Sequence, residues 1–169
     1  MANQPPPADD NPRYREFRRQ VLLSQQAPIT GTQVIMHPAF EDISFMFCGQ
    51  VSKACLMVGD DGNLWPRLLD MDVAHDLASI PVVSTMKLTL EDYLGVDFSD
   101  IEITFEVSNP AGVTVLDIIN ALANECARVI QTSEGPMPLA EALNTRFFEG
   151  LSLMERTGDA LKGYIDFGS

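Results

Sequence analysis

The chain has 169 residues, of which 46% are hydrophobic and 21% charged, and this predicts one globular domain with a buried core. Its 24 acidic residues outnumber 11 basic ones, and a net charge of −13 argues against general binding to nucleic acids or anionic membranes. No apolar run approaches the roughly 20 residues that a membrane-crossing helix needs, and the N-terminal residues lack the pattern of a secretory signal. The three cysteines show no framework spacing, so we expect a reducing, cytoplasmic (intracellular) location.

A basic segment near the N-terminus stands out against this acidic composition. Residues 13–19 hold four of the eleven basic residues, whereas the chain from Gln20 onward has 21 acidic and 7 basic residues. Tyr14, Phe17 and Val21 repeat with helical spacing among the arginines, which predicts an amphipathic helix that ends before Pro28. We therefore expect a disordered tail over residues 1–12, a basic helical arm over 13–27 and a single α+β domain over 28–169.

The middle of the chain reads as short strands. Apolar segments at 34–36, 43–47 and 53–58 predict strands, and the sequence Asp-Asp-Gly-Asn at 60–63 predicts a turn. Residues 64–81 are irregular and predict loops or short helices. Strict alternation of apolar and polar residues over 86–90 and 101–107 then predicts two half-buried strands.

Helical patterns follow the second alternating strand. Thr114 is a good N-cap, Asp117 completes a capping box, and an apolar stripe continues to Ile130, so a helix is predicted over about 114–131. A second helix is predicted from Pro138 to about Arg156, and Tyr164–Phe167 is expected to form a short edge strand. Strands first and helices later predict an α+β fold: an antiparallel or mixed sheet with two main C-terminal helices packed on one face.

Part of the chain resembles a known domain family. The segments Val83–Leu88, Ile101–Val107 and Gly112–Ile119 resemble uncharacterised domains that are abundant in mushroom-forming (basidiomycete) fungi, and Phe148–Leu151 resembles a Phe-x-Gly-Leu near the C-terminal end of that family. The resemblance covers about residues 75–155 and departs from the family at Asp100-Ile101, where a Trp-Pro pair is frequent. It implies a fungal origin and a fold, and it transfers no activity and no catalytic residue.

Residues capable of catalysis or metal binding are scarce. The nearest to an acid–base group is Asp72, His75 and Asp76, which would share one face of a helix; a solvated acidic loop explains them equally well. Both histidines lack cysteines at zinc-ligand spacing, and the turn at 60–63 fails as a calcium loop because Leu68 occupies the position of the required carboxylate. No phosphate-binding loop or nucleophile motif is present, so we expect no metal and no cofactor, and whether the protein is an enzyme stays open, with the balance against it.

The charge segregation suggests a function in binding. We expect a non-enzymatic protein-interaction or self-assembly module whose basic arm contacts an acidic body, either its own or that of a second copy in a homo-oligomer. The alternatives are a solubilising terminal helix, and a small-molecule-binding protein or enzyme with a pocket near residues 70–76. The expected contact residues are Arg13, Tyr14, Arg15, Phe17, Arg18 and Arg19.

Overall fold

The computed structural model of this chain describes residues 10–27, 33–46, 50–57, 66–92, 101–132, 134–143 and 147–168, without the side chains of residues 92 and 101. Its helices, short 3₁₀ segments included, are α1 (Pro12–Gln26), η2 (Pro38–Glu41), η3 (Val51–Lys53), η4 (Leu68–Asp70), η5 (Asp72–His75), α2 (Val115–Cys126) and α3 (Leu139–Ala142). Its strands are β1 (Ile35–Met36), β2 (Ile43–Ser44), β3 (Cys55–Leu56), β4 (Ser79–Ile80), β5 (Thr85–Asp92), β6 (Ile101–Ser108), β7 (Val129–Thr132), β8 (Gly135–Pro138), β9 (Phe147–Thr157) and β10 (Ala160–Gly168).

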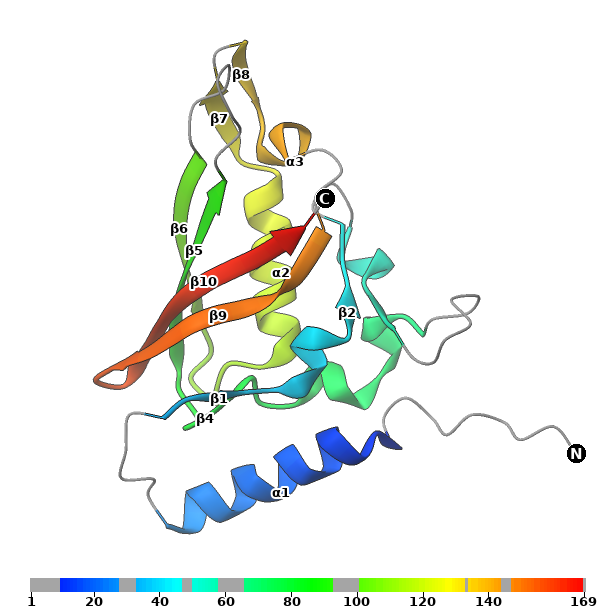
Figure 1. The fold of residues 1–169 in the computed structure, drawn as a ribbon, viewed down its shortest axis with the longest axis vertical. Helices are drawn as coiled ribbons and strands as arrows, with labels where there is room; N and C mark the ends of the chain where they lie inside the picture. The colour runs from blue at the N-terminus through cyan, green and yellow to red at the C-terminus, as the bar shows by residue number, and fades with distance from the viewer. Residues whose placement is uncertain are drawn as a thin grey trace, which may run out of the picture.

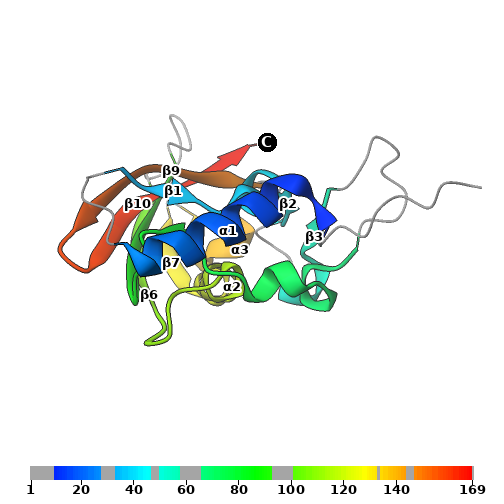
Figure 2. The same ribbon diagram turned by 90° about the horizontal axis from the view of Figure 1, so that it is seen from below.

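The largest sheet has four strands in the order β6-β5-β10-β9. Strand β5 runs antiparallel to β6, while β10 runs parallel to β5 and antiparallel to β9, so the sheet is mixed. The short pairs β1–β4, β2–β3 and β7–β8 are all antiparallel. Figures 1 and 2 show this sheet curving around α2, with α1 crossing the end of the molecule beside β1 and β4.

The main core lies between α2 and the inner face of the sheet. Alternate residues of β5 and β6 point inward and are buried, as the period of two predicts: Met86, Leu88, Leu90, Ile103, Phe105 and Val107. The apolar stripe of α2 faces them and is also buried: Val115, Ile118, Ile119, Leu122 and Cys126. The intervening residues of β5 and β6 therefore form the outer face of the sheet, away from α2.

Helix α2 begins where the sequence predicts. The Thr114 hydroxyl accepts the backbone N–H of Asp117 at 3.2 Å, and the Asp117 carboxylate accepts the backbone N–H of Thr114 at 2.9 Å, which completes a capping box. The side-chain amide of Asn109 donates to the same carboxylate at 2.8 Å. Burial acts to raise the pKa of Asp117, but the hydrogen bonds from Asn109 and Thr114 outweigh it and hold this pKa below its ordinary value.

The predicted strand–turn–helix is confirmed from Ile101 to Cys126. Val129 and Ile130, which were expected on the helix, belong instead to β7. The helix ends at Cys126 with Ala127 as its C-cap, and the Arg128 carbonyl then accepts the backbone N–H of Leu139 at 2.7 Å, so the chain turns into the β7–β8 hairpin.

The predicted arrangement, an α+β fold with two main C-terminal helices packed on one face of an antiparallel or mixed sheet, is wrong. Among the described residues of the predicted helix 138–156, four form α3 and those from Phe147 onward belong to β9. The sheet instead packs against α2, and the other long helix, α1, is N-terminal (Figure 1).

The physical reason lies in the second half of that segment. Leu139, Leu143 and Phe147 recur with helical spacing, but buried Phe148 and Gly150 alternate with exposed neighbours, which is the period of a strand. Gly150 has a φ of 143°, which is incompatible with a helix interior. Cross-strand pairing with β10 decides in favour of the strand.

The C-terminal strand is longer and more central than predicted. The expected edge strand at 164–167 is part of β10, which lies between β5 and β9 inside the sheet. The turn predicted at 60–63 lies outside the described residues, as do residues 1–9 of the tail predicted over 1–12. The remainder of that tail prediction is wrong, because Asn11 is the N-cap of α1 and Pro12 is its first residue.

Candidate functional site

Helix α1 is an amphipathic helix, as its sequence predicts. The side chain of Asn11 caps it by accepting the backbone N–H of Arg13 at 2.9 Å, and Pro12 occupies the first position, where no N–H is needed. Tyr14, Phe17 and Val21 are buried against the body of the protein. The helix therefore lies on the body with its aromatic stripe inward.

Two carboxylates of the body bind the N-terminal turn of α1. The Arg13 guanidinium donates to Glu41 and to Asp42, both at 2.7 Å, and the Tyr14 hydroxyl donates to Asp42 at 2.6 Å. Burial acts to lower the pKa of Arg13, but its hydrogen bonds to Glu41 and Asp42 raise it above the ordinary value. Glu41 and Asp42 come from η2 and the residue after it, so one short turn supplies both acceptors.

A third carboxylate, Asp76, binds the middle of α1. Its Oδ2 accepts the Nε–H of Arg18 at 2.7 Å and lies 3.2 Å from Nε2 of His37. The His37 Nδ1 accepts the backbone N–H of Ala39 at 3.0 Å, so the ring donates to Asp76 through Nε2. Because both ring nitrogens are engaged, His37 positions Asp76 and is not arranged as a base for a substrate.

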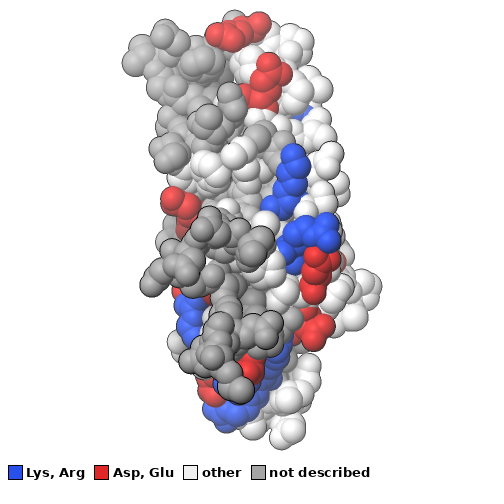
Figure 3. All heavy atoms as spheres, turned by 90° about the vertical axis from the view of Figure 1, so that its right-hand side faces the viewer, with Lys and Arg blue, Asp and Glu red and all other residues white. Residues whose placement is uncertain are grey.

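His37 also links the acidic surface to the aromatic stripe. Its side chain is buried, and its ring centroid lies 4.5 Å from that of Phe17 and 5.2 Å from that of Tyr14. We call the residues that receive α1 the α1-binding surface: His37, Glu41, Asp42, Asp76 and Ile80. Figure 3 shows basic and acidic side chains next to one another at the end of the molecule where α1 lies.

The six expected contact residues of the arm divide into two groups. Arg13, Tyr14, Phe17 and Arg18 reach the body, whereas Arg15 and Arg19 pair with acids of their own segment. Arg19 binds Glu16 at 2.7 Å, and this hydrogen bond is the main reason that the pKa of Glu16 falls to about 2. The contact surface is therefore one face of the arm.

The acidic candidates Asp72, His75 and Asp76 do not form one catalytic group. Residues 72–75 form the 3₁₀ helix η5, and Asp76 follows it in extended conformation with its carboxylate turned toward α1. Asp72 and His75 are not buried. The structure thus joins Asp76 to Arg18, two residues that sequence reasoning placed in separate candidate regions.

A groove lies where these two regions meet. It has a volume of about 290 Å³ and runs between the C-terminal half of α1 and the segment after η5. We call it the α1 groove; its lining is mainly apolar and consists of Phe17, Arg18, Val21, Leu22, Gln25, His75, Asp76 and Leu77. Leu22, one of these lining residues, is 60% exposed.

Sequence reasoning missed His37, Glu41 and Asp42. The sequence signal that could have found them is His-Pro at 37–38 followed by two acids at 41–42. This pattern is typical of a short capped turn, but it does not show which residues the two acids bind. Within the described residues, no group of three or more His, Cys, Asp or Glu is arranged to hold a metal ion. Among those residues, too, no helix is long and apolar enough to cross a membrane.

Comparison with known proteins gave no match to a family model, to a curated protein or to a solved structure. The resemblance to fungal domains therefore stays a prediction.

Proposed function

We propose that this protein is a non-enzymatic interaction module that self-assembles by exchanging α1, so that α1 of one copy occupies the α1-binding surface of another. The observation that carries the proposal is the charge complementarity of the contact. Basic side chains on one face of α1 meet Glu41, Asp42 and Asp76 of a body that is otherwise rich in acids.

The packing of α1 supports exchange as well. Tyr14 reaches the main core, but Phe17 and Val21 form a small apolar cluster with Ile80 that is separate from it. Because α1 contributes one side chain to the main core and α2 contributes five, detaching α1 costs less free energy than detaching α2. When identical copies exchange α1, every contact between α1 and its binding surface is kept, so the exchange itself costs little free energy.

Reversal of one ion pair tests exchange directly. Arg18→Glu and Asp76→Lys each place like charges in contact, so each variant alone should bind its own α1 weakly. In an equimolar mixture, an exchanged heterodimer pairs Glu with Lys at one contact and restores Arg18 with Asp76 at the other. We expect light scattering to show a dimer in the mixture and chiefly monomer in either variant alone.

The double variant Arg18→Glu/Asp76→Lys is the matched control, because it restores attraction within each chain and shows whether the reversed pair folds beside His37. If the double variant folds and the mixture still contains only monomers at high concentration and low salt, exchange is excluded. A wild-type chain that stays monomeric under the same conditions also excludes exchange.

A second candidate function, small-molecule binding with or without catalysis, is favoured by the α1 groove. His75 and Asp76 line it together with apolar side chains, the usual composition of a small ligand site. A fragment that raises the melting temperature of the wild type should lose its effect in His75→Ala and keep it in Asp72→Ala, a control outside the lining. If a fragment raises the melting temperature of both variants as much as that of the wild type, it binds outside the α1 groove.

A cytoplasmic location and a fungal origin belong to the proposal as well. Support comes from the odd number of cysteines without framework spacing, and from the resemblance over about residues 75–155. Thiol labelling of the protein under native and denaturing conditions would test the first part: all three cysteines should react after unfolding without reductant.

A further inference from the structure

The outer face of the four-stranded sheet is organised in rows of like chemistry. Pairing places Thr89 opposite Thr104 on β6 and beside Tyr164 on β10, and Tyr164 is opposite Ser152 on β9. Cross-strand partners point to the same side of a sheet, so four hydroxyl groups cross the face in one row. The hydroxyls of Thr89 and Thr104 lie 3.0 Å apart.

The neighbouring row contains two lysines side by side. Lys87 on β5 is the register partner of Lys162 on β10, and the chain has only one other lysine, Lys53. Like charges on paired strand positions destabilise a sheet. Their adjacency is a local concentration of positive charge in a chain with a net charge of −13.

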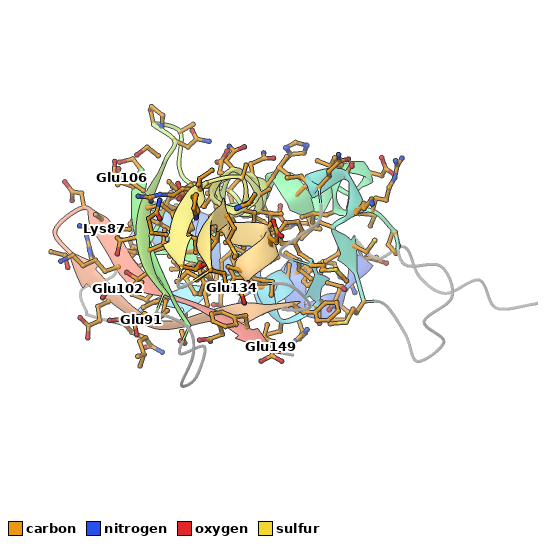
Figure 4. All side chains as sticks on the ribbon, turned by 90° about the horizontal axis from the view of Figure 1, so that it is seen from above. Lys87, Glu91, Glu102, Glu106, Glu134 and Glu149 are labelled. Atoms are coloured by element: carbon orange, nitrogen blue, oxygen red, sulfur yellow. The ribbon has the colours of Figure 1, made fainter. Side chains whose placement is uncertain are left out.

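A glutamate flanks each lysine on its other side. Glu106 is opposite Lys87, and Glu155 is opposite Lys162. The Glu106 carboxylate accepts a hydrogen bond from Ser108, along its own strand, at 3.1 Å. Within the part of the chain that the structure describes, neither lysine forms an ion pair. Figure 4 shows Lys87 and Glu106 on the side of β5 and β6 that faces away from α2.

A hollow joins the lysine pair to the hydroxyl row. Its volume is about 230 Å³, and its lining is Lys87, Thr89, Thr104, Lys162, Gly163 and Tyr164. Pockets for drug-sized molecules measure about 300–1,000 Å³, so this hollow fits a smaller ligand. Gly163 has no side chain, and the side chain of Met154 on β9 occupies the space that one would need on the inner side of the sheet. On the outer side, Gly163 contributes backbone atoms of β10 to the lining of the hollow.

We propose that this hollow binds a small hydroxylated anion, with its phosphate or carboxylate group between Lys87 and Lys162 and its hydroxyl groups on the row of Thr89, Thr104 and Tyr164. Two ammonium groups supply six donors to the charged group. Hydroxyl side chains both donate and accept, which matches the alternating requirements of a sugar or polyol. The site is on the outer face of the sheet, shares no residue with the α1-binding surface and is independent of exchange.

Amide chemical shifts of the full chain, followed by NMR during titration, test the proposal. The probes are inorganic phosphate, glucose 6-phosphate, glucuronate and uncharged glucose, each at constant ionic strength. We expect saturable shifts of β5 and β10 amides with glucose 6-phosphate or glucuronate, tighter than with phosphate, and none with glucose. A response to glucose 6-phosphate alone identifies a phosphate ligand, and a response to glucuronate alone identifies a carboxylate ligand.

Lysine variants separate a specific site from general charge effects. Lys87→Gln and Lys162→Gln should each weaken binding at least tenfold, because each removes one of the two cations that hold the anion. Lys53→Gln makes the same change in net charge on η3 and should leave binding unchanged. The proposal is overturned if no probe gives saturable shifts at β5 and β10, or if the three variants weaken binding equally.

Discussion

Helices α1 and α2 are attached to the same body by different forces. Val115, Ile118, Ile119 and Leu122 of α2 have no exposed surface and lie in the main core, and a capping box fixes the start of the helix. Helix α1 buries three side chains and adds ion pairs to the body, while Leu22 and Leu23 stay exposed. The two helices differ in how much apolar surface they bury.

This difference separates the element that defines the fold from the element that can leave it. Exposed ion pairs are screened by salt, whereas burial of apolar side chains involves no charge that salt could screen. We therefore expect α1 to respond to ionic strength and to charge reversal while α2 does not.

Ile118→Ala should destabilise the whole protein by about 4 kcal/mol, because it leaves a cavity between α2 and the sheet. Urea denaturation monitored by circular dichroism measures this change. Because α2 belongs to the main core, amides of β5, β6 and α2 should lose hydrogen-exchange protection together. A loss confined to α2 would contradict the picture of one cooperative core.

Phe17→Ala should weaken the attachment of α1 by about 3 kcal/mol, at the low end for a buried phenylalanine because the α1 groove borders the site. Hydrogen exchange should show fast exchange in α1 with protection of β5 and α2 retained. Leu22→Ala, an exposed position on the same helix, is the matched control and should change little. Equal loss of protection in both helices would show that α1 unfolds together with the main core and not separately.

The smallest expected effect is the pH dependence of the α2 cap. Folding lowers the pKa of Asp117, so its ionised form stabilises the fold above the unfolded-state value near 4. That contribution is lost as the pH falls through the lower, folded-state pKa. We expect less than about 1 kcal/mol between pH 7 and pH 3, since the group is partly exposed to solvent.

Asp117→Asn isolates this contribution from those of the other acids. The variant should be less stable than the wild type at pH 7, and the difference in unfolding free energy should shrink toward pH 3. A difference that is constant over this range would mean that the charge of Asp117 does not act on the helix.

Local sequence patterns were enough to predict β5, β6 and α2, because each element buries one face. The apolar residues therefore recur with the period of a strand or of a helix within the element itself. Thr114 and Asp117 mark the start of α2 within four residues, independently of the rest of the fold. Residues 147–157 carry an ambiguous pattern in which apolar residues at helical spacing overlap with strand alternation. Pairing with β10 decides that case, and a partner strand is not visible in the segment itself.

The candidate site shows the same limit. The basic face of α1 and its aromatic stripe could be predicted, since both lie within one helix. Its acceptors Asp42 and Asp76 lie far apart in the sequence, and only tertiary structure places both beneath one helix. The buried role of His37 was not predictable either, because it depends on Asp76 and on the backbone of Ala39.

The position of β10 has a consequence for how the chain acquires its structure. This strand lies between β5 and β9, and its parallel pairing with β5 closes a long loop of chain. During synthesis the β5–β6 hairpin and α2 leave the ribosome well before β10. The backbone N–H and C=O groups on one edge of β5 therefore stay unpaired until β10 is made. We expect slow folding in which the pairing of β10 with β5 is the rate-limiting step. Until then, the unpaired edge of β5 is where we expect chaperones to bind or nascent chains to aggregate.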